Sequence, residues 1–169
     1  MAKGKPKKAT PWYRQRCMIA DVVERHADDR GALTVIANAR SFGHPIGAVA
    51  VLVSKAGTVR GEHRHRREGH IVHVVSGRMV YRVRSAAGLV HRTVGPGEAV
   101  FTPPNVDHAF LFTADSVCVV IANISRTQEA YEADLTRLED AAKLFLEAEV
   151  LAAAGIPHGL PPSGKPKGE

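Results

Sequence analysis

The chain has 169 residues, a formal charge of +6 and 44% hydrophobic residues, which predicts one globular domain with a sizeable core. Two cysteines are too few for a disulfide framework, and no apolar run approaches the roughly 20 residues that span a bilayer. Because no apolar segment follows the basic N-terminus, we expect no secretory signal and a cytoplasmic location.

The positive charge is concentrated near the two ends of the sequence. Residues 1–16 contain six Lys or Arg and no acidic residue, and residues 165–169 contain two Lys and one Glu. The 15 basic and 16 acidic residues between them nearly cancel. We therefore expect residues 1–16 and 156–169 to be solvated, disordered tails, without a membrane or nucleic-acid partner. The alternative is a basic arm that contacts nucleic acid or an anionic surface.

Residues 17–124 show the pattern of an all-β domain. Short segments rich in Val and Ile alternate with turn signals that contain Gly, Pro and Asp, which predicts many short strands and favours a sandwich or barrel. The expected strands are 18–23, 33–37, 48–54, 71–75, 79–83, 89–94, 99–102, 109–112 and 116–122.

The pattern changes after residue 124. Ser125 and Gln128 have the spacing of a capping box at the start of a helix. Apolar residues then recur at helical spacing, at Leu135, Leu138, Ala142 and Phe145. We therefore predict a C-terminal helix within residues 125–155, with its apolar face packed on the barrel or against another subunit.

Two segments contain histidines at regular intervals. The first has Gly57, His63, His65, His70 and Gly77, and the second has Gly97, Pro103, Asn105 and His108. Residues two apart on a strand share a face, so the imidazoles of His63 and His65 can both point into a barrel. Neutral imidazoles are common ligands of transition metals. The alternatives are histidines that transfer protons or only form hydrogen bonds, and an exposed basic hairpin in which the histidines are incidental.

This spacing resembles the paired motif of the cupins, with His70, Asn105 and Phe112 where cupins have Glu, Gly and Asn. The resemblance implies a double-stranded β-helix, the jelly-roll barrel of the cupins, followed here by the C-terminal helix. It also implies that His63, His65, His70 and His108 converge inside the barrel, where they could bind Fe, Ni, Zn or Mn.

Residues 29–34, 60–65 and 116–122 further resemble one cupin branch, the sugar 3,4-ketoisomerases and 4-keto-sugar 3,5-epimerases. This resemblance implies metal-independent proton transfer by His63, His65 and His108. It implies that Arg30 stabilises the diphosphate or the enolate, and that the protein is a homodimer. Residues 46–51 lack the tyrosine pair of that branch, and His70 replaces its Gln.

Three functions follow as alternatives. The first is isomerisation or epimerisation of a nucleotide-linked 4-keto-6-deoxy sugar, with Arg60 as a further residue that binds a phosphate or carboxylate. The second is a metal-dependent cupin enzyme, a dioxygenase or isomerase of a small organic acid. The third is a ligand-binding cupin without catalysis. His73 lies three residues after His70, and strand alternation predicts that it faces the opposite side of the sheet.

Overall fold

The computed structural model describes residues 24–29, 31–37, 45–85 and 88–155. The expected strand at 18–23, the residue Arg30 and both expected tails lie outside these ranges. None of the helices in the described ranges is long and apolar enough to cross a membrane.

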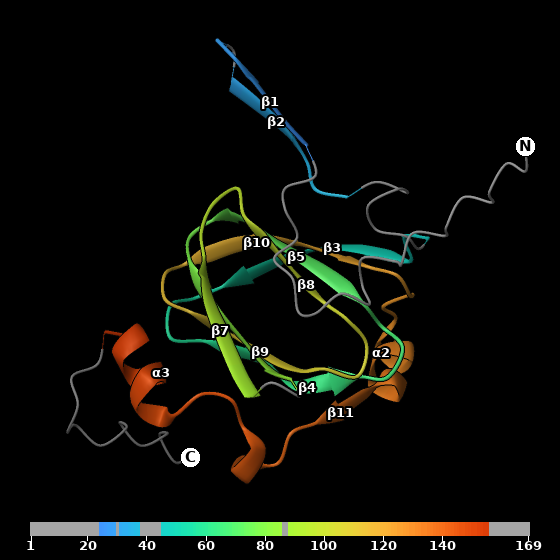
Figure 1. Cartoon of the computed structure of the whole chain (residues 1–169), viewed down its shortest axis with the longest axis vertical. Helices are drawn as coiled ribbons and strands as arrows, with labels where there is room; N and C mark the ends of the chain where they lie inside the picture. The colour runs from blue at the N-terminus through green and yellow to red at the C-terminus, as the bar shows by residue number, and fades with distance from the viewer. Residues whose placement is uncertain (1–23, 30, 38–44, 86–87, 156–169) are drawn as a thin grey trace, which may run out of the picture.

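Two antiparallel sheets face each other and form the barrel (Figure 1). One sheet has the order β3-β10-β5-β8, with β3 at Ala48–Ser54, β10 at Ser116–Ala122, β5 at His70–Ser76 and β8 at Ala99–Thr102. The other has the order β11-β4-β9-β6-β7, with β11 at Leu135–Arg137, β4 at Val59–His65, β9 at Asp107–Phe112, β6 at Met79–Ser85 and β7 at Gly88–Val94. This arrangement confirms the all-β jelly-roll prediction.

Side chains from the inner faces of both sheets fill the space between them. The main core cluster is apolar and includes Val72, Val74, Met79, Val94, Phe110, Phe112 and Val120. Successive residues of a strand face opposite sides of its sheet, and those that face inward supply this core. The alternation on β5 places His70 inward and His73 on the opposite face, as predicted, but His73 is buried there and does not lie at the surface.

A separate hairpin extends from one end of the barrel (Figure 1). It consists of β1, Glu24–Asp28, and β2, Gly31–Val35, which pair only with each other. The sequence analysis missed β1 and gave β2 slightly different limits.

The expected strands at 48–54, 99–102 and 116–122 have the observed limits, but β4 was missed. The sequence of β4 is polar and contains a bulge between Gly61 and His63. Gly61 has a φ of 89°, and a Cβ there would lie 2.9 Å from the carbonyl oxygen of His108. Only glycine therefore fits where β4 crosses β9.

The prediction of one helix within residues 125–155 is wrong. This segment forms α2 at Gln128–Asp134, then β11, a 3₁₀ turn at Asp140–Ala142, and α3 at Glu147–Ala153. The N-cap of α2 is Thr127, whose hydroxyl accepts a hydrogen bond from the backbone N–H of Ala130, so the cap lies two residues after Ser125.

The open edge of β4 explains the break in the helix. β11 pairs with this edge and satisfies backbone groups that would otherwise have no partner. After β11 in the sequence, Leu144 and Phe145 pack on Ala109 and Leu111 of β9, on the outer face of that strand. The apolar residues that have helical spacing in the sequence thus belong to several short segments, and these segments pack on the barrel.

Candidate active site in the barrel

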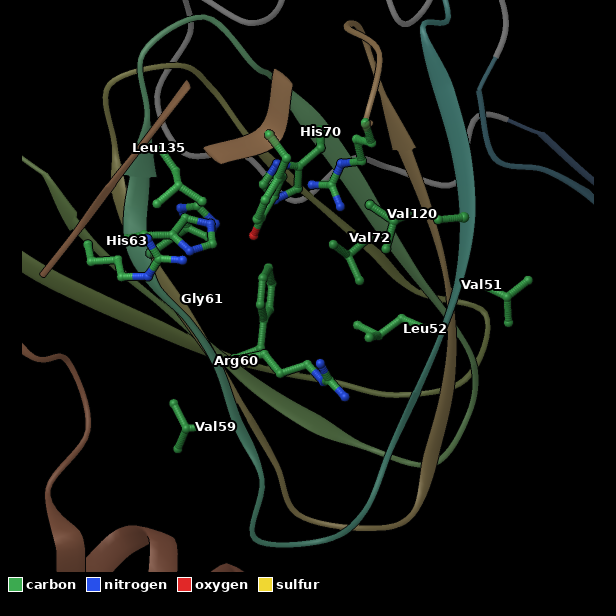
Figure 2. Close-up of a pocket in the computed structure, with 16 residues that line it drawn as sticks. Val51, Leu52, Val59, Arg60, Gly61, His63, His70, Val72, Val120 and Leu135 are labelled. Atoms are coloured by element: carbon green, nitrogen blue, oxygen red, sulfur yellow. The ribbon is translucent and has the colours of Figure 1, made fainter. Parts of the chain in front are cut away.

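A cavity of about 410 Å³ opens between the two sheets (Figure 2). Aliphatic side chains from β3, β5 and β10 form one wall, including Leu52, Val72 and Val120. Polar side chains form the other parts, and these are Arg60, His63, His70, His108, Arg126, Tyr131 and Arg137. The cavity therefore has an apolar side opposite a group of titratable and charged residues.

The barrel brings together the four histidines of the two motifs. His63 and His65 come from β4, His70 from β5 and His108 from β9, and His63 pairs with His108 in the sheet register. The ring centroids of His63 and His108 are 4.7 Å apart, and those of His70 and His108 are 5.0 Å apart. His65 does not line the cavity, because it lies behind His63 with the two Nε2 atoms 3.0 Å apart.

A buried carboxylate that the sequence analysis missed lies behind His65. The Oδ2 atom of Asp134 is 3.4 Å from Nδ1 of His65, and both side chains are almost fully buried. The same carboxylate accepts hydrogen bonds from the backbone N–H groups of Arg67 and Glu68. Asp134, His65 and His63 thus form a line that runs from the protein interior to the cavity.

A second buried carboxylate, Glu68, was also missed. Its Oε1 atom lies 2.9 Å from Nδ1 of His70 and 3.5 Å from Nε2 of His65. Arg126 donates to both oxygens of Glu68, from Nε at 3.0 Å and from Nη2. Although burial raises the pKa of Glu68, the hydrogen bonds from His70 and Arg126 lower it to about 2. The carboxylate is therefore ionised and paired.

The histidines are held in the neutral form. Burial, together with the charge of the neighbouring imidazoles, lowers the pKa of His63 to about 3. Burial lowers the pKa of His65 to about 4, and it also lowers the pKa values of His70 and His108. Each ring therefore keeps an unprotonated nitrogen at neutral pH, which can accept a proton or bind a metal.

Tyr131 supplies a phenol to the same cavity. It lies on α2, and its ring centroid is 6.0 Å from that of His63 and 5.4 Å from that of His65. Burial raises the pKa of Tyr131, so the phenol stays protonated at neutral pH. The cavity thus contains a tyrosine from α2, although residues 46–51 lack the tyrosine pair of the ketoisomerase branch. The sequence analysis did not select Tyr131.

Two further arginines line the cavity. Arg60 donates from Nε to the hydroxyl of Ser54 at 2.7 Å and from Nη2 to the carbonyl oxygen of Val53, which fixes it against β3. Arg137, which the sequence analysis did not select, pairs with the exposed Glu132.

Three of the histidines could also bind a metal ion. His63, His65 and His108 each offer a ring nitrogen, and these atoms lie within 4.8 Å of one another. Nδ1 of His65 faces Asp134, and Nδ1 of His108 lies 3.1 Å from the carbonyl oxygen of Val106. Contacts of this kind typically orient metal-bound histidines. The residues therefore fit a divalent metal. His70, expected as a fourth ligand, falls in a separate group with His65 and Glu68.

Comparison with known proteins agrees with the fold. Residues 50–123 match the family model described as the cupin domain. The barrel therefore contains a segment similar to the cupin domain. No curated protein matches the sequence.

Solved structures with the same cupin fold include two classes of sugar-nucleotide enzyme. The QdtA sugar 3,4-ketoisomerase from Thermoanaerobacterium thermosaccharolyticum, in complex with TDP, is 20% identical, with a TM-score of 0.60 over 70% of this chain and 86% of that one. A 3,4-ketoisomerase from Helicobacter canadensis is 16% identical, with a TM-score of 0.63 over 83% and 98%. The dTDP-4-dehydrorhamnose 3,5-epimerase from Sulfolobus tokodaii is 19% identical, with a TM-score of 0.59 over 70% and 74%. At these identities the likeness establishes the fold.

Proposed function

We propose that the protein is an isomerase or epimerase of a nucleotide-linked 4-keto-6-deoxy sugar. The observation that supports this function best is the buried line Asp134–His65–His63, which ends in a cavity that Tyr131 also faces. The likeness of the fold to ketoisomerases and epimerases with TDP-linked substrates supports the same class of reaction.

In this proposal His63 is the base. We assign the hydrogen of neutral His65 to Nδ1, which faces the carboxylate of Asp134. Nε2 of His65 then has no hydrogen and accepts a hydrogen bond from Nε2–H of His63. His63 then keeps Nδ1 unprotonated, and this atom takes the proton from the carbon next to the sugar ketone. The electron pair of the broken C–H bond moves to the ketone oxygen and forms an enolate. In an epimerisation His63 returns the proton to carbon and the ketone re-forms. In an isomerisation the phenol of Tyr131 donates a proton to the old ketone oxygen and regains one from the neighbouring hydroxyl, whose carbon becomes the new ketone, while His63 returns its proton to the old ketone carbon.

The arginines at the cavity account for the nucleotide part of the substrate. Arg60 and Arg137 are charged at every physiological pH and can bind the oxygens of a diphosphate in pairs. Arg30, expected in this role from the resemblance, lies outside the described residues. The proposed contribution of Arg60 therefore has a geometric basis, and that of Arg30 stays a prediction.

The test uses TDP and TDP-4-keto-6-deoxyglucose. We expect TDP to raise the melting temperature, and we expect the hydrogen next to the ketone to exchange with solvent deuterium in NMR spectra. His63→Asn should slow the exchange at least about 100-fold. The control is His91→Asn, which changes an exposed histidine on β7. No stabilisation and no exchange would refute the proposal, whereas binding without exchange would favour the non-catalytic function.

A metal-dependent enzyme is the second candidate, and the group formed by His63, His65 and His108 favours it. These residues would hold Fe, Ni, Zn or Mn, and the ion would act as a Lewis acid toward a bound carbonyl or carboxylate. Elemental analysis of protein purified without added metal tests this function. About one equivalent that is lost in His108→Asn would support it, and substoichiometric metal in the wild-type protein would contradict it.

We further propose that the protein is a homodimer. The outward side chains of the edge strand β3, Val49, Val51 and Val53, are 63–70% exposed. Three neighbouring valines on a strand with one open edge are a suitable surface for a second copy of the chain. Light scattering after size-exclusion chromatography should give twice the mass of 18.2 kDa.

A further inference from the structure

The proposed reaction creates negative charge in a cavity whose histidines are neutral. Removal of a proton next to a ketone places an anion on the ketone oxygen, and enzymes lower the barrier by fixing positive charge at that oxygen. Among the described residues that line the cavity, the side chains with permanent positive charge are Arg60, Arg126 and Arg137. One of them is expected to face the enolate.

Arg126 is linked to the histidines through Glu68, whose Oε1 atom lies 2.9 Å from Nδ1 of His70. The charge of Arg126 is among the causes of the lowered pKa values of His63, His65 and His70. Its guanidinium carbon also lies 5.3 Å from the centre of the Tyr131 ring. Arg126 therefore lies beside both groups that would handle the proton.

The hydrogen bonds of Arg126 leave donors available to a ligand. A guanidinium has five N–H groups, and Glu68 accepts from Nε and from Nη2. The other three N–H groups have no hydrogen-bond partner in the described part of the chain. The side chain of Arg126 is 25% exposed and that of Glu68 is fully buried, so the carboxylate fixes the arginine from the interior and leaves one edge toward the cavity.

We propose that Arg126 is a catalytic residue that donates hydrogen bonds to the enolate oxygen, and that Glu68 is its positioning residue. This role rests on the proposed isomerase or epimerase function. As the carbon–hydrogen bond breaks, the proton goes to His63 and the electron pair goes to the ketone oxygen, where the guanidinium stabilises the charge. Because arginine stays protonated at all physiological pH values, this positive charge is present in every catalytic cycle.

The variants must avoid a charge left without its partner. Arg126→Met alone would strand the buried Glu68 carboxylate, which is strongly destabilising. The double variant Glu68→Gln/Arg126→Met removes both charges, and Glu68→Gln keeps the arginine but loosens it. The matched control is Glu149→Gln/Arg82→Met, because Arg82 and Glu149 form a similar two-point ion pair on the outside of the barrel.

The readout is deuterium exchange into TDP-4-keto-6-deoxyglucose, measured by NMR together with TDP binding. We expect Glu68→Gln/Arg126→Met to bind TDP but to exchange about 100-fold more slowly than the control variant. Glu68→Gln should give an intermediate loss. Millimolar guanidinium chloride should restore exchange at least tenfold in the double variant and leave the control unchanged, a rescue that a purely structural role would not show.

Two results would overturn the inference. If the double variant exchanges within threefold of the control, or if guanidinium fails to rescue a folded double variant, Arg126 does not stabilise the enolate. If the wild-type protein neither binds TDP nor catalyses exchange, the proposed function fails, and the role of Arg126 fails with it.

Discussion

Mild acid should destabilise this protein through its buried histidines. Burial lowers the pKa of His63 from 6.5 to about 3 and that of His65 from 6.5 to about 4. In the unfolded chain both imidazoles regain their ordinary pKa values. Between pH 6.5 and pH 4 the unfolded chain therefore binds protons that the folded protein does not, and the free energy of unfolding must fall as the pH falls.

The size of the effect follows from the distance between the pH and the unfolded pKa. Each pH unit below 6.5 costs about 1.4 kcal/mol for each histidine that stays neutral when folded. At pH 5 the loss is about 2 kcal/mol for His63 and about 2 kcal/mol for His65, relative to neutral pH. A loss of about 4 kcal/mol is large beside the 5–15 kcal/mol typical of a domain. His70 and His108 act in the same direction.

The carboxylate in the same network acts in a different pH range. Because the pKa of Glu68 is lowered from 4.5 to about 2, its stabilisation is fully present above 4.5 and is lost as the pH falls toward 2. Between pH 7 and pH 5 it adds nothing to the slope. The histidines alone therefore account for the expected loss within this network.

Urea denaturation followed by circular dichroism at pH 7, 6 and 5 measures this effect. A chelator in every buffer keeps metal from masking the titration. His65→Asn should reduce the loss between pH 7 and pH 5 by about 2 kcal/mol, since one imidazole no longer titrates on unfolding. The exposed histidine variant His91→Asn should leave the loss unchanged. An unfolding free energy that is constant from pH 7 to pH 5, or an equal loss in His65→Asn, would refute the reasoning.

Three other substitutions test separate features. Gly61→Ala should cost about 2 kcal/mol or more, measured by urea denaturation, because its Cβ meets the His108 carbonyl and its φ is positive; an unchanged midpoint would contradict this. Asp134→Asn should slow deuterium exchange about 100-fold without weakening TDP binding, since it removes the acceptor behind His65. Val51→Lys should give a monomer by light scattering if β3 forms the dimer contact.

Strand alternation predicted that His63 and His65 share a face, and the resemblance to the paired cupin motif implied that His70 and His108 meet them. Residues two apart on one strand share a face, and the second motif supplied a histidine from a strand that pairs with it. This held although β4 itself was missed, because its polar sequence lacks the Val and Ile that indicate a strand. The histidines can be located from the spacing of a motif. The limits of a polar strand such as β4 depend on the strands that pair with it, which the sequence alone does not reveal.

The residues behind the histidines could not be found in the same way. Glu68 follows β4 in a loop, and Asp134 ends a helix 66 residues later in the sequence. Nothing in the sequence pairs them, because they meet only once β11 has closed on the edge of β4. Arg126 is equally remote, 58 residues after its partner. Acidic residues and arginines are usually exposed. The sequence therefore gave no reason to expect that Glu68 and Asp134 are buried, or that Arg126 pairs with a buried carboxylate.

Arg126 also bears on the choice between the two candidate functions. Imidazoles with one nitrogen held by an acceptor suit both a metal and a proton-transfer reaction, so the geometry of His63, His65 and His108 fits either. Arg126 opposes a proton on these rings, but the carboxylate of Glu68 favours one more strongly, so the ion pair does not exclude a divalent ion. The guanidinium would stabilise an enolate in the same place. The case for proton transfer on a keto sugar therefore rests on the donors of Arg126 at the cavity, and not on the balance of charge around the histidines.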